Sequence, residues 1–252
     1  MKIQYCSDLH LEFRENKSFL KEHPIEPIGE ILMLAGDVVP FAFMEKNKDF
    51  FSYISDHFRS SYWMPGNHEY YHSDISKRSG TLNENIRTNV HLVNNIAIEK
   101  EATRFVFSTL WSKINPDNKW YIEKGVSDFE FIKYKGYRFS IDRFNELHEE
   151  CLQFLTKELQ VGSVGKTIVA THHVPTYLNY PDKYKGSDLN EAFVVELAAL
   201  IKSNGPDYWI YGHHHHNTPE FKIGNTTMLT NQLGYVRQNE QKGFRTNAII
   251  QI

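Results

Sequence analysis

The stretch KIQYCSDLH, residues Lys2–His10, contains the pattern on which the fold of this chain depends. Its apolar residues predict a short buried strand over Ile3–Cys6, and two side chains that can bind a metal, Asp8 and His10, follow closely. In open α/β sheets, ligands gather beyond the carboxyl ends of the strands. The stretch therefore predicts a strand that delivers reactive side chains to one edge of a sheet.

The same arrangement recurs along the chain. A second buried strand is predicted over Ile31–Ala35, before Gly36-Asp37, and a third over Ser61–Met64, before Gly66-Asn67-His68-Glu69. Three later strands are predicted, over Arg104–Leu110, Thr167–Thr171 and Tyr208–Tyr211.

Segments with helical periodicity alternate with these strands. Ile141–Leu159 has its apolar residues on one stripe, and Asn190–Lys202 predicts a second helix. Near the end, Glu220–Ile223 and Thr226–Thr230 flank Gly224-Asn225, a pair suited to a two-residue hairpin turn. Strands that alternate with helices predict an α/β fold in which stacked sheets are flanked by helices.

Composition limits the class of protein. With 252 residues, of which 40% are hydrophobic and 23% charged, the chain predicts a single globular domain, residues 1–252. The stretch Trp111–Ser140 is too aromatic for a disordered loop, and we interpret it as an insertion around 111–140 near the mouth of the site. The formal net charge of −3 gives no global attraction to nucleic acid, so affinity for phosphate needs a local source.

The expected compartment is the cytoplasm. Cys6 and Cys151 are the two cysteines, and Cys6 lies in a predicted apolar strand, which argues against a disulfide framework. No uninterrupted run of about 18 apolar residues occurs, so no membrane span is predicted. The first strand begins without a charged leader or an apolar signal stretch.

Five short blocks carry side chains that can hold cations. They are Asp8-Leu9-His10, Gly36-Asp37, Gly66-Asn67-His68-Glu69, His172 and Gly212-His213-His214-His215. Each block alone is common, and a Gly-Asp or Gly-Asn pair often marks only a turn. Together they supply carboxylate, imidazole and amide donors without thiolate, a set suited to two ions of manganese, iron or zinc rather than calcium.

The blocks resemble the signature of the calcineurin-like metallophosphoesterase superfamily: D-x-H, G-D, G-N-H-[DE], an isolated His and G-H-x-H. The resemblance implies a four-layer α/β/β/α sandwich with a dinuclear metal site at the sheet edge. By this resemblance one metal is held by Asp8, His10 and His215, the other by Asn67, His172 and His213, and Asp37 bridges the two. His173 stays open as an alternative to His172, since Val174 intervenes before the proline that often follows directly in relatives.

The run His213–His216 is internal and follows an apolar strand, so it is neither an affinity tag nor a metal-sequestering segment. Alternate side chains that leave a strand end point the same way. We therefore expect His213 and His215 to face the metals while His214 points elsewhere. His216 is assigned no role.

The expected charge balance favours phosphate. Only Asp8 and Asp37 carry negative charge against two dications, so the site should stay electropositive and lower the pKa of a bridging water. The resemblance then implies in-line attack on phosphorus by a metal-bridging hydroxide. His68 is the predicted catalytic residue, as proton donor to the departing alkoxide. Glu69 either orients His68 or is a solvated loop carboxylate.

The predicted function is a metal-dependent phosphohydrolase that cleaves a phosphodiester or a phosphomonoester. Val38-Val39-Pro40 follows Asp37, without the Asp-Arg-Gly continuation of protein Ser/Thr phosphatases or the tyrosine ligand of purple acid phosphatases, which argues against both subfamilies. The expected substrate is a small phosphate ester or a nucleotide. A nucleic-acid substrate stays open without support, because no basic groove is evident. The alternative, a non-catalytic binding or regulatory module on this fold, predicts gaps in the ligand set.

Further residues near the site have two interpretations each. Trp111 and Trp120 either stack on a nucleobase or belong to a small core of the insertion. Tyr70–His72 either line the pocket or are ordinary loop aromatics. Asn190 and Arg237 either contact phosphate or sugar or are solvated surface residues.

Overall fold

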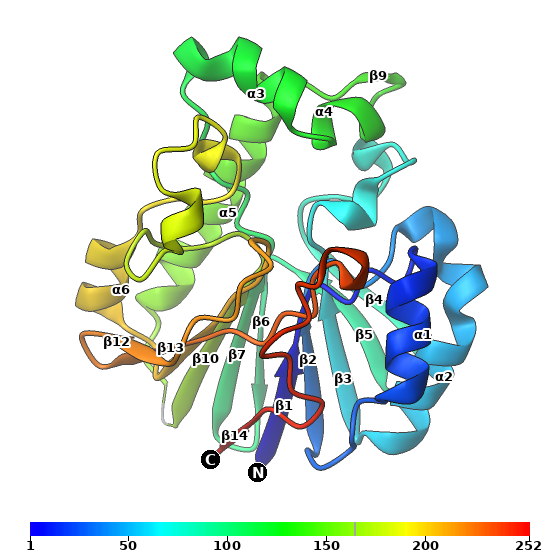
Figure 1. Ribbon diagram of the computed structural model, residues 1–252. Coiled ribbons are helices and arrows are strands. Elements are labelled where there is room, and N and C mark those ends of the chain that lie inside the picture. The colour runs from blue at the N-terminus through cyan, green and yellow to red at the C-terminus, as the bar shows by residue number, and fades with distance from the viewer. Residues whose placement is uncertain (164) are drawn as a thin grey trace.

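The computed structural model describes residues 1–163 and 165–252. Within these residues, two six-stranded mixed sheets pack face to face, and helices cover the two outer faces (Figure 1). The predicted four-layer α/β/β/α sandwich is therefore confirmed.

The first sheet has four parallel strands in its middle and one antiparallel strand at each edge. In spatial order its strands are β14 (Ile249–Gln251), β1 (Lys2–Cys6), β2 (Ile31–Ala35), β3 (Ser60–Met64), β5 (Val90–Asn94) and β4 (Leu82–Arg87).

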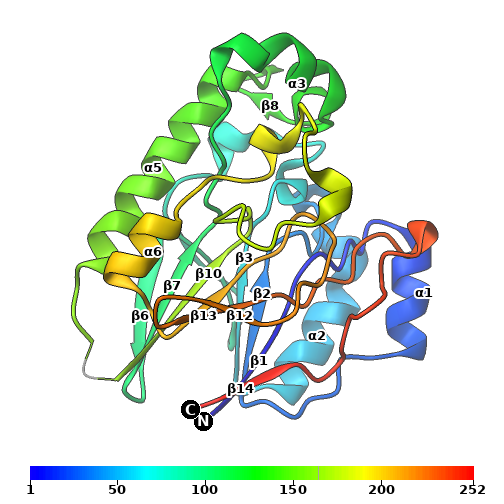
Figure 2. The ribbon, with the colours of Figure 1, turned by 60° about the vertical axis from the view of Figure 1, so that its left-hand side comes forward.

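The second sheet repeats this plan, with four parallel central strands and antiparallel edges. Its strands are, in spatial order, β12 (Phe221–Ile223), β13 (Thr226–Leu229), β11 (Tyr208–Ile210), β10 (Lys166–Thr171), β7 (Thr103–Ser108) and β6 (Ile96–Lys100). The termini lie side by side at the end of the sheets where β1 begins (Figure 2), and the Met1 amine donates to the Ile252 carbonyl at 2.7 Å.

Six helices cover the sheets and the top of the molecule in the described part of the chain. They are α1 (Arg14–Glu22), α2 (Lys48–His57), α3 (Lys119–Gly125), α4 (Asp128–Phe131), α5 (Ile141–Leu159) and α6 (Ala198–Asn204). Short 3-10 helices connect them: η1 (Phe41–Asn47), η2 (His68–Tyr70), η3 (Ile75–Lys77), η4 (Pro116–Asn118), η5 (Asp182–Tyr184), η6 (Asn190–Ala192) and η7 (Val236–Gln238). Among the described helices, none has both the length and the apolar character needed to cross a bilayer.

The layers follow from the alternation of side chains along each strand. In β2, Met33 belongs to the core between the sheets, whereas Leu32 and Leu34 pack with α2 residues on the outer face. In β7, Phe105 lies between the sheets, and Val106 packs in the outer core that α5 covers. Successive side chains of a strand point to opposite faces of its sheet. Because both faces of these sheets are covered, nearly every residue of such a strand is apolar.

The helix predicted over Asn190–Lys202 is confirmed only in its last part, where α6 lies, and is wrong before Ala198. Asn190–Ala192 forms only the turn η6, Val194 pairs with Val174 in a β-bridge, and α6 begins at Ala198. The Val195 amide donates to the Val174 carbonyl at 3.0 Å, so tertiary pairing replaces the helical hydrogen bonds there.

The stretch 111–140 is mostly regular structure. It contains η4, α3, α4 and a hairpin of β8 (Lys133–Tyr134) and β9 (Tyr137–Arg138). Trp111 and Phe129 pack with Tyr70 and other buried residues in a core that this stretch shares with α5. Trp120 is 60% exposed, so of the two tryptophans only Trp111 is part of that core.

Candidate metal centre

All seven residues predicted as metal ligands converge at the carboxyl ends of parallel strands from both sheets. Asp8 and His10 follow β1, Asp37 follows β2, Asn67 follows β3, His172 follows β10, and His213 and His215 follow β11. Each side chain thus reaches the centre because its strand ends at the same edge.

One group consists of Asp8, His10, Asp37 and His215, whose potential ligand atoms all lie within 4.8 Å of one another. The Nε2 atoms of His10 and His215 are 2.9 Å apart. His215 Nε2 lies 3.4 Å from Asp8 Oδ1, and His10 Nε2 lies 3.7 Å from Asp37 Oδ2. Two carboxylates and two imidazoles therefore face a common point.

A second group consists of Asp37, His172 and His213, within the same 4.8 Å limit. His172 Nε2 lies 3.3 Å from Asp37 Oδ1 and 3.1 Å from Asn67 Oδ1, which brings the amide oxygen to this group. Asp37 thus directs Oδ2 toward one group and Oδ1 toward the other, as a bridging carboxylate would.

His173 lies outside both groups. Its ring packs against Trp111, Phe144 and His213, and neither of its ring nitrogens has a hydrogen-bond partner among the described residues. Of the two candidates at this position, the structure brings His172 to the centre and buries His173 among aromatic rings.

The backbone at the centre is strained. Left-handed φ angles occur at five of the seven predicted ligands: Asp8 (56°), His10 (46°), Asp37 (53°), His213 (78°) and His215 (47°). Such conformations cost about 1–3 kcal/mol each in non-glycine residues and cluster at functional sites. His214 does turn away, toward Gln232, but the reason is this left-handed backbone and not the strand alternation that the sequence predicts.

Two glycines leave room for the ligands. A Cβ on Gly66 would lie 2.2 Å from Asp37 Oδ1 and 2.5 Å from His172 Nε2. A Cβ on Gly36, whose φ is 89°, would lie 2.3 Å from His172 Nδ1. The G-D and G-N blocks therefore need glycine because any side chain would occupy the space of the donors.

Three of the imidazoles are oriented by a partner on Nδ1, which faces away from the centre. His10 Nδ1 lies 3.1 Å from Glu12 Oε1, and His215 Nδ1 lies 2.8 Å from Glu240 Oε2. His172 Nδ1 lies 3.0 Å from the Ala35 carbonyl. Such partners hold the Nδ1 proton and leave Nε2 free to bind a cation.

Asp128 does the same for the amide of Asn67. Asn67 Nδ2 donates to Asp128 Oδ1 at 2.7 Å, so the amide oxygen must face His172 and Asp37. The Tyr71 hydroxyl donates to the same carboxylate oxygen at 2.8 Å. The roles of Glu12, Asp128 and Glu240 were not predicted from the sequence. Of the three, only Glu12 lies close in sequence to the ligand that it orients, two residues beyond His10.

His68 lies at the rim of the centre. Its Nδ1 is 2.9 Å from Glu12 Oε1, and its Nε2 is 3.2 Å from the Tyr235 hydroxyl. Burial alone would lower the pKa of His68, but Asp37, Glu12 and Asp128 raise it. The imidazole is therefore biased toward its protonated form.

Neither interpretation of Glu69 is correct. It is fully buried, and its carboxylate accepts hydrogen bonds from the amides of Asp37, Val38 and Gly66 and from Trp63 Nε1, at 2.7–2.9 Å. Burial and the Asp37 carboxylate raise the pKa of Glu69 to about 8, and the Val38 and Trp63 donors oppose that shift. Glu69 ties together the loops after β2 and β3, and Glu12 is the carboxylate that contacts His68.

The carboxylates make the centre attractive to positive charge. Burial would raise the pKa of Asp37, but His172, His68 and His10 hold it well below its ordinary value. Burial would lower the pKa of His215, but the hydrogen bonds to Asp8 and Glu240 raise it to about 10. Buried carboxylates attract positive charge, as a metal site requires. The donor set therefore fits divalent ions.

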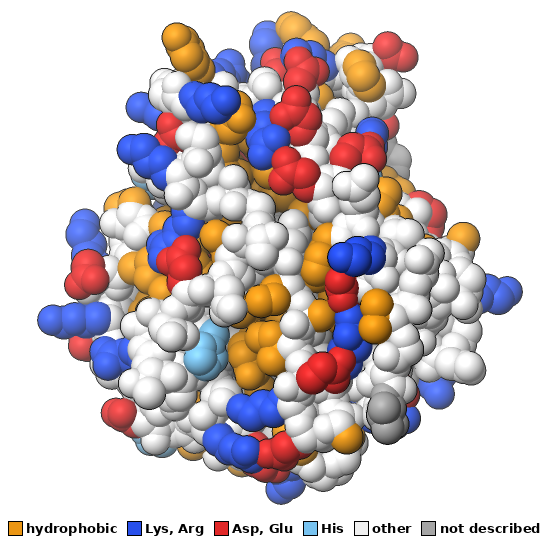
Figure 3. Space-filling model, turned by 180° about the vertical axis from the view of Figure 1, so that it is seen from behind, with side chains coloured by type: hydrophobic (Ala, Val, Ile, Leu, Met, Phe, Trp, Pro, Cys, Tyr) orange, Lys and Arg blue, Asp and Glu red, His pale blue; other side chains and the backbone are white. Residues whose placement is uncertain are grey.

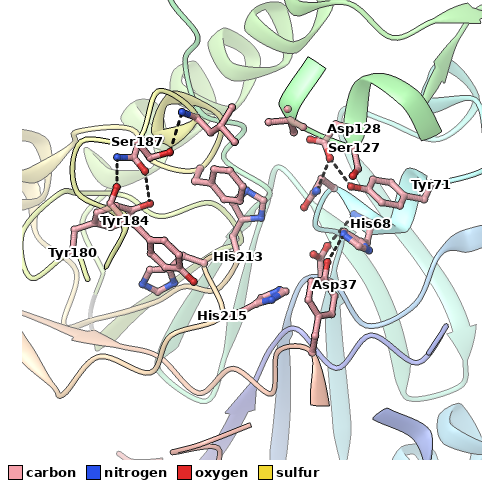
Figure 4. Close-up of a pocket in the computed structure, with 18 residues that line it drawn as sticks. Asp37, His68, Tyr71, Ser127, Asp128, Tyr180, Tyr184, Ser187, His213 and His215 are labelled. Atoms are coloured by element: carbon pink, nitrogen blue, oxygen red, sulfur yellow. Dashed lines mark hydrogen bonds between the residues drawn. The ribbon is translucent and has the colours of Figure 1, made fainter. Parts of the chain in front are cut away.

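A cleft of about 310 Å³ opens above the centre (Figure 4). One wall comes from Gly125–Asp128 in the stretch 111–140, the other from residues between Tyr180 and Phe193, and Tyr71 and Tyr235 also line it. Of the further candidates, Asn190 lies in a wall, whereas Tyr70 lies in the core and Arg237 is not among the described lining residues.

The fold and the paired donor groups define the class of this protein as a metal-dependent phosphoesterase. The family model for calcineurin-like phosphoesterases matches residues 1–217, and the chain belongs to this family. Its activity is therefore phosphoester hydrolysis in general, and the family implies divalent metal ions.

Among curated proteins, the chain is 32% identical to the uncharacterised protein L509 of Acanthamoeba polyphaga mimivirus, over 99% of this chain and 96% of that protein. Among solved structures, a phosphopantetheinyl hydrolase from Mycobacterium tuberculosis has a TM-score of 0.71 at 15% identity, covering 99% of this chain and 95% of the other. A dimetal phosphatase from Danio rerio has a TM-score of 0.51 at 12% identity, covering 92% and 87%. These structural likenesses show the shared fold.

Proposed function

We propose that this protein cleaves a phosphodiester or a phosphomonoester with two divalent transition metal ions, of manganese, iron or zinc. One ion would be held by Asp8, His10 and His215, the other by Asn67, His172 and His213, with Asp37 between them. The observation that carries the proposal is the position of Asp37, whose two oxygens face two separate groups of nitrogen and oxygen donors.

When bound, the two ions would supply Lewis-acid activation of a water nucleophile and neutralise charge on the phosphoryl oxygens. The protein supplies fixed positions. Glu12, Glu240 and Ala35 hold the outer nitrogens of three imidazoles, and Asp128 holds the amide of Asn67. No donor then has to reorganise when a substrate arrives, which is the basis of electrostatic preorganisation.

His68 would donate the proton that the leaving alkoxide needs. Asp37, Glu12 and Asp128 favour the imidazolium form of His68, in which Nδ1 donates to Glu12 and Nε2 carries the proton available in the cleft. General acid catalysis of this kind is worth about 10²–10⁴-fold for a poor leaving group. A good leaving group such as p-nitrophenolate needs no proton and should gain little.

A non-catalytic binding module is the alternative function. It predicts gaps in the ligand set, and all seven predicted donors converge at the sheet edge. We therefore favour the hydrolase over the binding module.

The first test is metal-dependent activity. Protein freed of metal and then titrated with Mn²⁺, Fe²⁺, Co²⁺ or Zn²⁺ should bind about two ions per chain. It should then hydrolyse p-nitrophenyl phosphate or bis-p-nitrophenyl phosphate. Inactivity with all four metals would support the binding module.

The second test concerns His68. His68→Ala should slow an alkyl phosphate by about 10²-fold or more while slowing the p-nitrophenyl ester much less. His23→Ala, an exposed histidine at the end of α1, is the matched control and should change neither rate. Equal slowing of the two esters by His68→Ala would show that the acid role is wrong.

A further inference from the structure

The walls of the cleft limit the size and chemistry of the leaving group that a substrate can carry. The cavity, about 310 Å³, is at the small end of the range for small-molecule sites. Figure 4 shows Ser127 and Asp128 on one side of the centre and Tyr180, Tyr184 and Ser187 on the other. The leaving group of a bound ester has to lie between these two walls.

The walls are joined to each other. Glu191 accepts a hydrogen bond from the Asn115 amide at 2.8 Å and another from Asn118 Nδ2 at 3.0 Å. A Cβ on Gly125 would lie 2.7 Å from Leu189 Cδ2, so the walls touch with no space for a side chain. A polymer that passed through the cleft would have to separate these contacts, whereas a small ester would not.

The described lining provides no lysine or arginine side chain. Among the described residues that line the cleft, none is Lys or Arg. On the face of the molecule shown in Figure 3, Lys and Arg side chains are scattered among Asp and Glu and form no continuous basic track. A second phosphate on the substrate would therefore lie in the cleft without a lysine or arginine to pair with and near the Asp128 carboxylate, which repels it.

Asp128 lines the cleft and has a buried hydrogen-bond acceptor without a partner among the described residues. It is 1% exposed, and its Oδ1 accepts from Asn67 and Tyr71. Its Oδ2 has no hydrogen-bond partner among the described residues. An unpaired buried acceptor is costly, and a donor on a bound ligand would satisfy it.

On the basis of the proposed function, we propose that the substrate is a small phosphoester with one phosphoryl group, whose leaving alcohol has no second anionic group. That alcohol presents a hydroxyl or N–H donor to Asp128 Oδ2. Nucleoside polyphosphates, dinucleoside polyphosphates and internal positions of nucleic acids are thereby disfavoured.

Two matched substrate pairs test the inference with the Mn²⁺-loaded protein. Glycerol 2-phosphate and isopropyl phosphate have the same carbon skeleton, with and without hydroxyl donors. Fructose 6-phosphate and fructose 1,6-bisphosphate differ by one phosphate. We expect kcat/KM to be about tenfold or more higher for the first member of each pair.

Two variants test whether residues of the cleft walls cause these substrate preferences. Asp128→Asn keeps one oxygen for Asn67 but replaces the free acceptor with a donor, and should reduce the first ratio about fivefold or more. Ser127→Lys puts a cation in the wall and should reduce the second ratio. Gln153→Lys adds the same charge at an exposed position of α5, outside the cleft lining, and should leave the second ratio unchanged.

The outcomes separate the inference from the proposed function. Equal kcat/KM values within either pair, in a protein that hydrolyses p-nitrophenyl phosphate, would overturn the inference alone. Internal cleavage of single-stranded DNA as fast as monoester hydrolysis would also overturn it. Loss of all turnover, including that of both p-nitrophenyl esters, would refute the proposed function and the inference together.

Discussion

Removal of the Asp128 carboxylate should weaken metal binding at one of the two positions. Asn67 Nδ2 donates to Asp128 Oδ1 at 2.7 Å, and this bond directs the Asn67 oxygen toward His172. A hydrogen bond to a charged group is worth about 1.5–3 kcal/mol. Since about 1.4 kcal/mol is a factor of ten, Asp128→Ala should weaken binding at the Asn67 position by about 10–100-fold, the usual cost of losing a partner of a metal ligand.

Titration calorimetry of the metal-free protein with Mn²⁺ measures this loss without any enzymatic turnover. We expect one affinity to fall while the affinity of the group around Asp8, His10 and His215 stays the same. Tyr71→Phe is the matched control, because it removes a donor to the same Asp128 oxygen but keeps the hydrogen bond between Asn67 and Asp128. It should weaken Mn²⁺ binding by less than about threefold. Unchanged affinities in a folded Asp128→Ala protein would refute the reasoning, and an equal fall at both positions would show a general collapse of the cleft instead.

Three other changes test the loops around the centre and the turn η3. Gly66→Ala should abolish metal binding in the same titration, because its Cβ would lie 2.5 Å from His172 Nε2. The control Gly162→Ala, whose Cβ would have nothing within 4 Å, should bind metal normally. Normal binding by both variants would contradict the steric argument. Glu69→Gln should lower the free energy of unfolding in urea by about 1–3 kcal/mol, since the buried N–H donors lose one of their two acceptor oxygens, and an unchanged free energy would count against it. Asp74→Ala should lower the free energy of unfolding by about 1 kcal/mol at pH 7. This loss is small because the side chain is half-exposed and water screens its charge. Hydrogen bonds from the Ser76 hydroxyl and from the Ser76, Lys135 and Gly136 amides lower the pKa of Asp74 from 3.8 to about 2, so the ionised form stabilises the fold above this range. That contribution should disappear as the pH falls through it, and a difference that does not depend on pH would contradict the assignment.

The candidate ligands were predictable because each follows a strand whose apolar residues identify it. Asp8 and Asp37 come within two residues of β1 and β2, so the local pattern is sufficient to place them at the edge. The residues that orient the ligands were not predictable in this way. Asp128 is 61 residues from Asn67, and Glu240 is 25 residues from His215, with no periodic signal at either position.

The errors have the same origin. The pattern over Asn190–Lys202 favours a helix, but a β-bridge between Val174 and Val194 interrupts it. Glu69 lies in a polar block that resembles an exposed loop, yet three backbone amides and the Trp63 indole donate hydrogen bonds to it. In both cases, hydrogen bonds to distant backbone outweigh the local preference.

By itself the sequence determined the α/β class, the strands and the order in which carboxylate, imidazole and amide donors reach one edge. Period-two burial and the residues just beyond a strand are local properties, which short-range patterns express directly. Only the tertiary structure decided that Asp37 faces both groups, that His172 rather than His173 reaches the centre, and that the stretch 111–140 supplies Asp128 to the cleft. These features depend on how the two sheets and that stretch pack, and such contacts join residues that no local pattern connects.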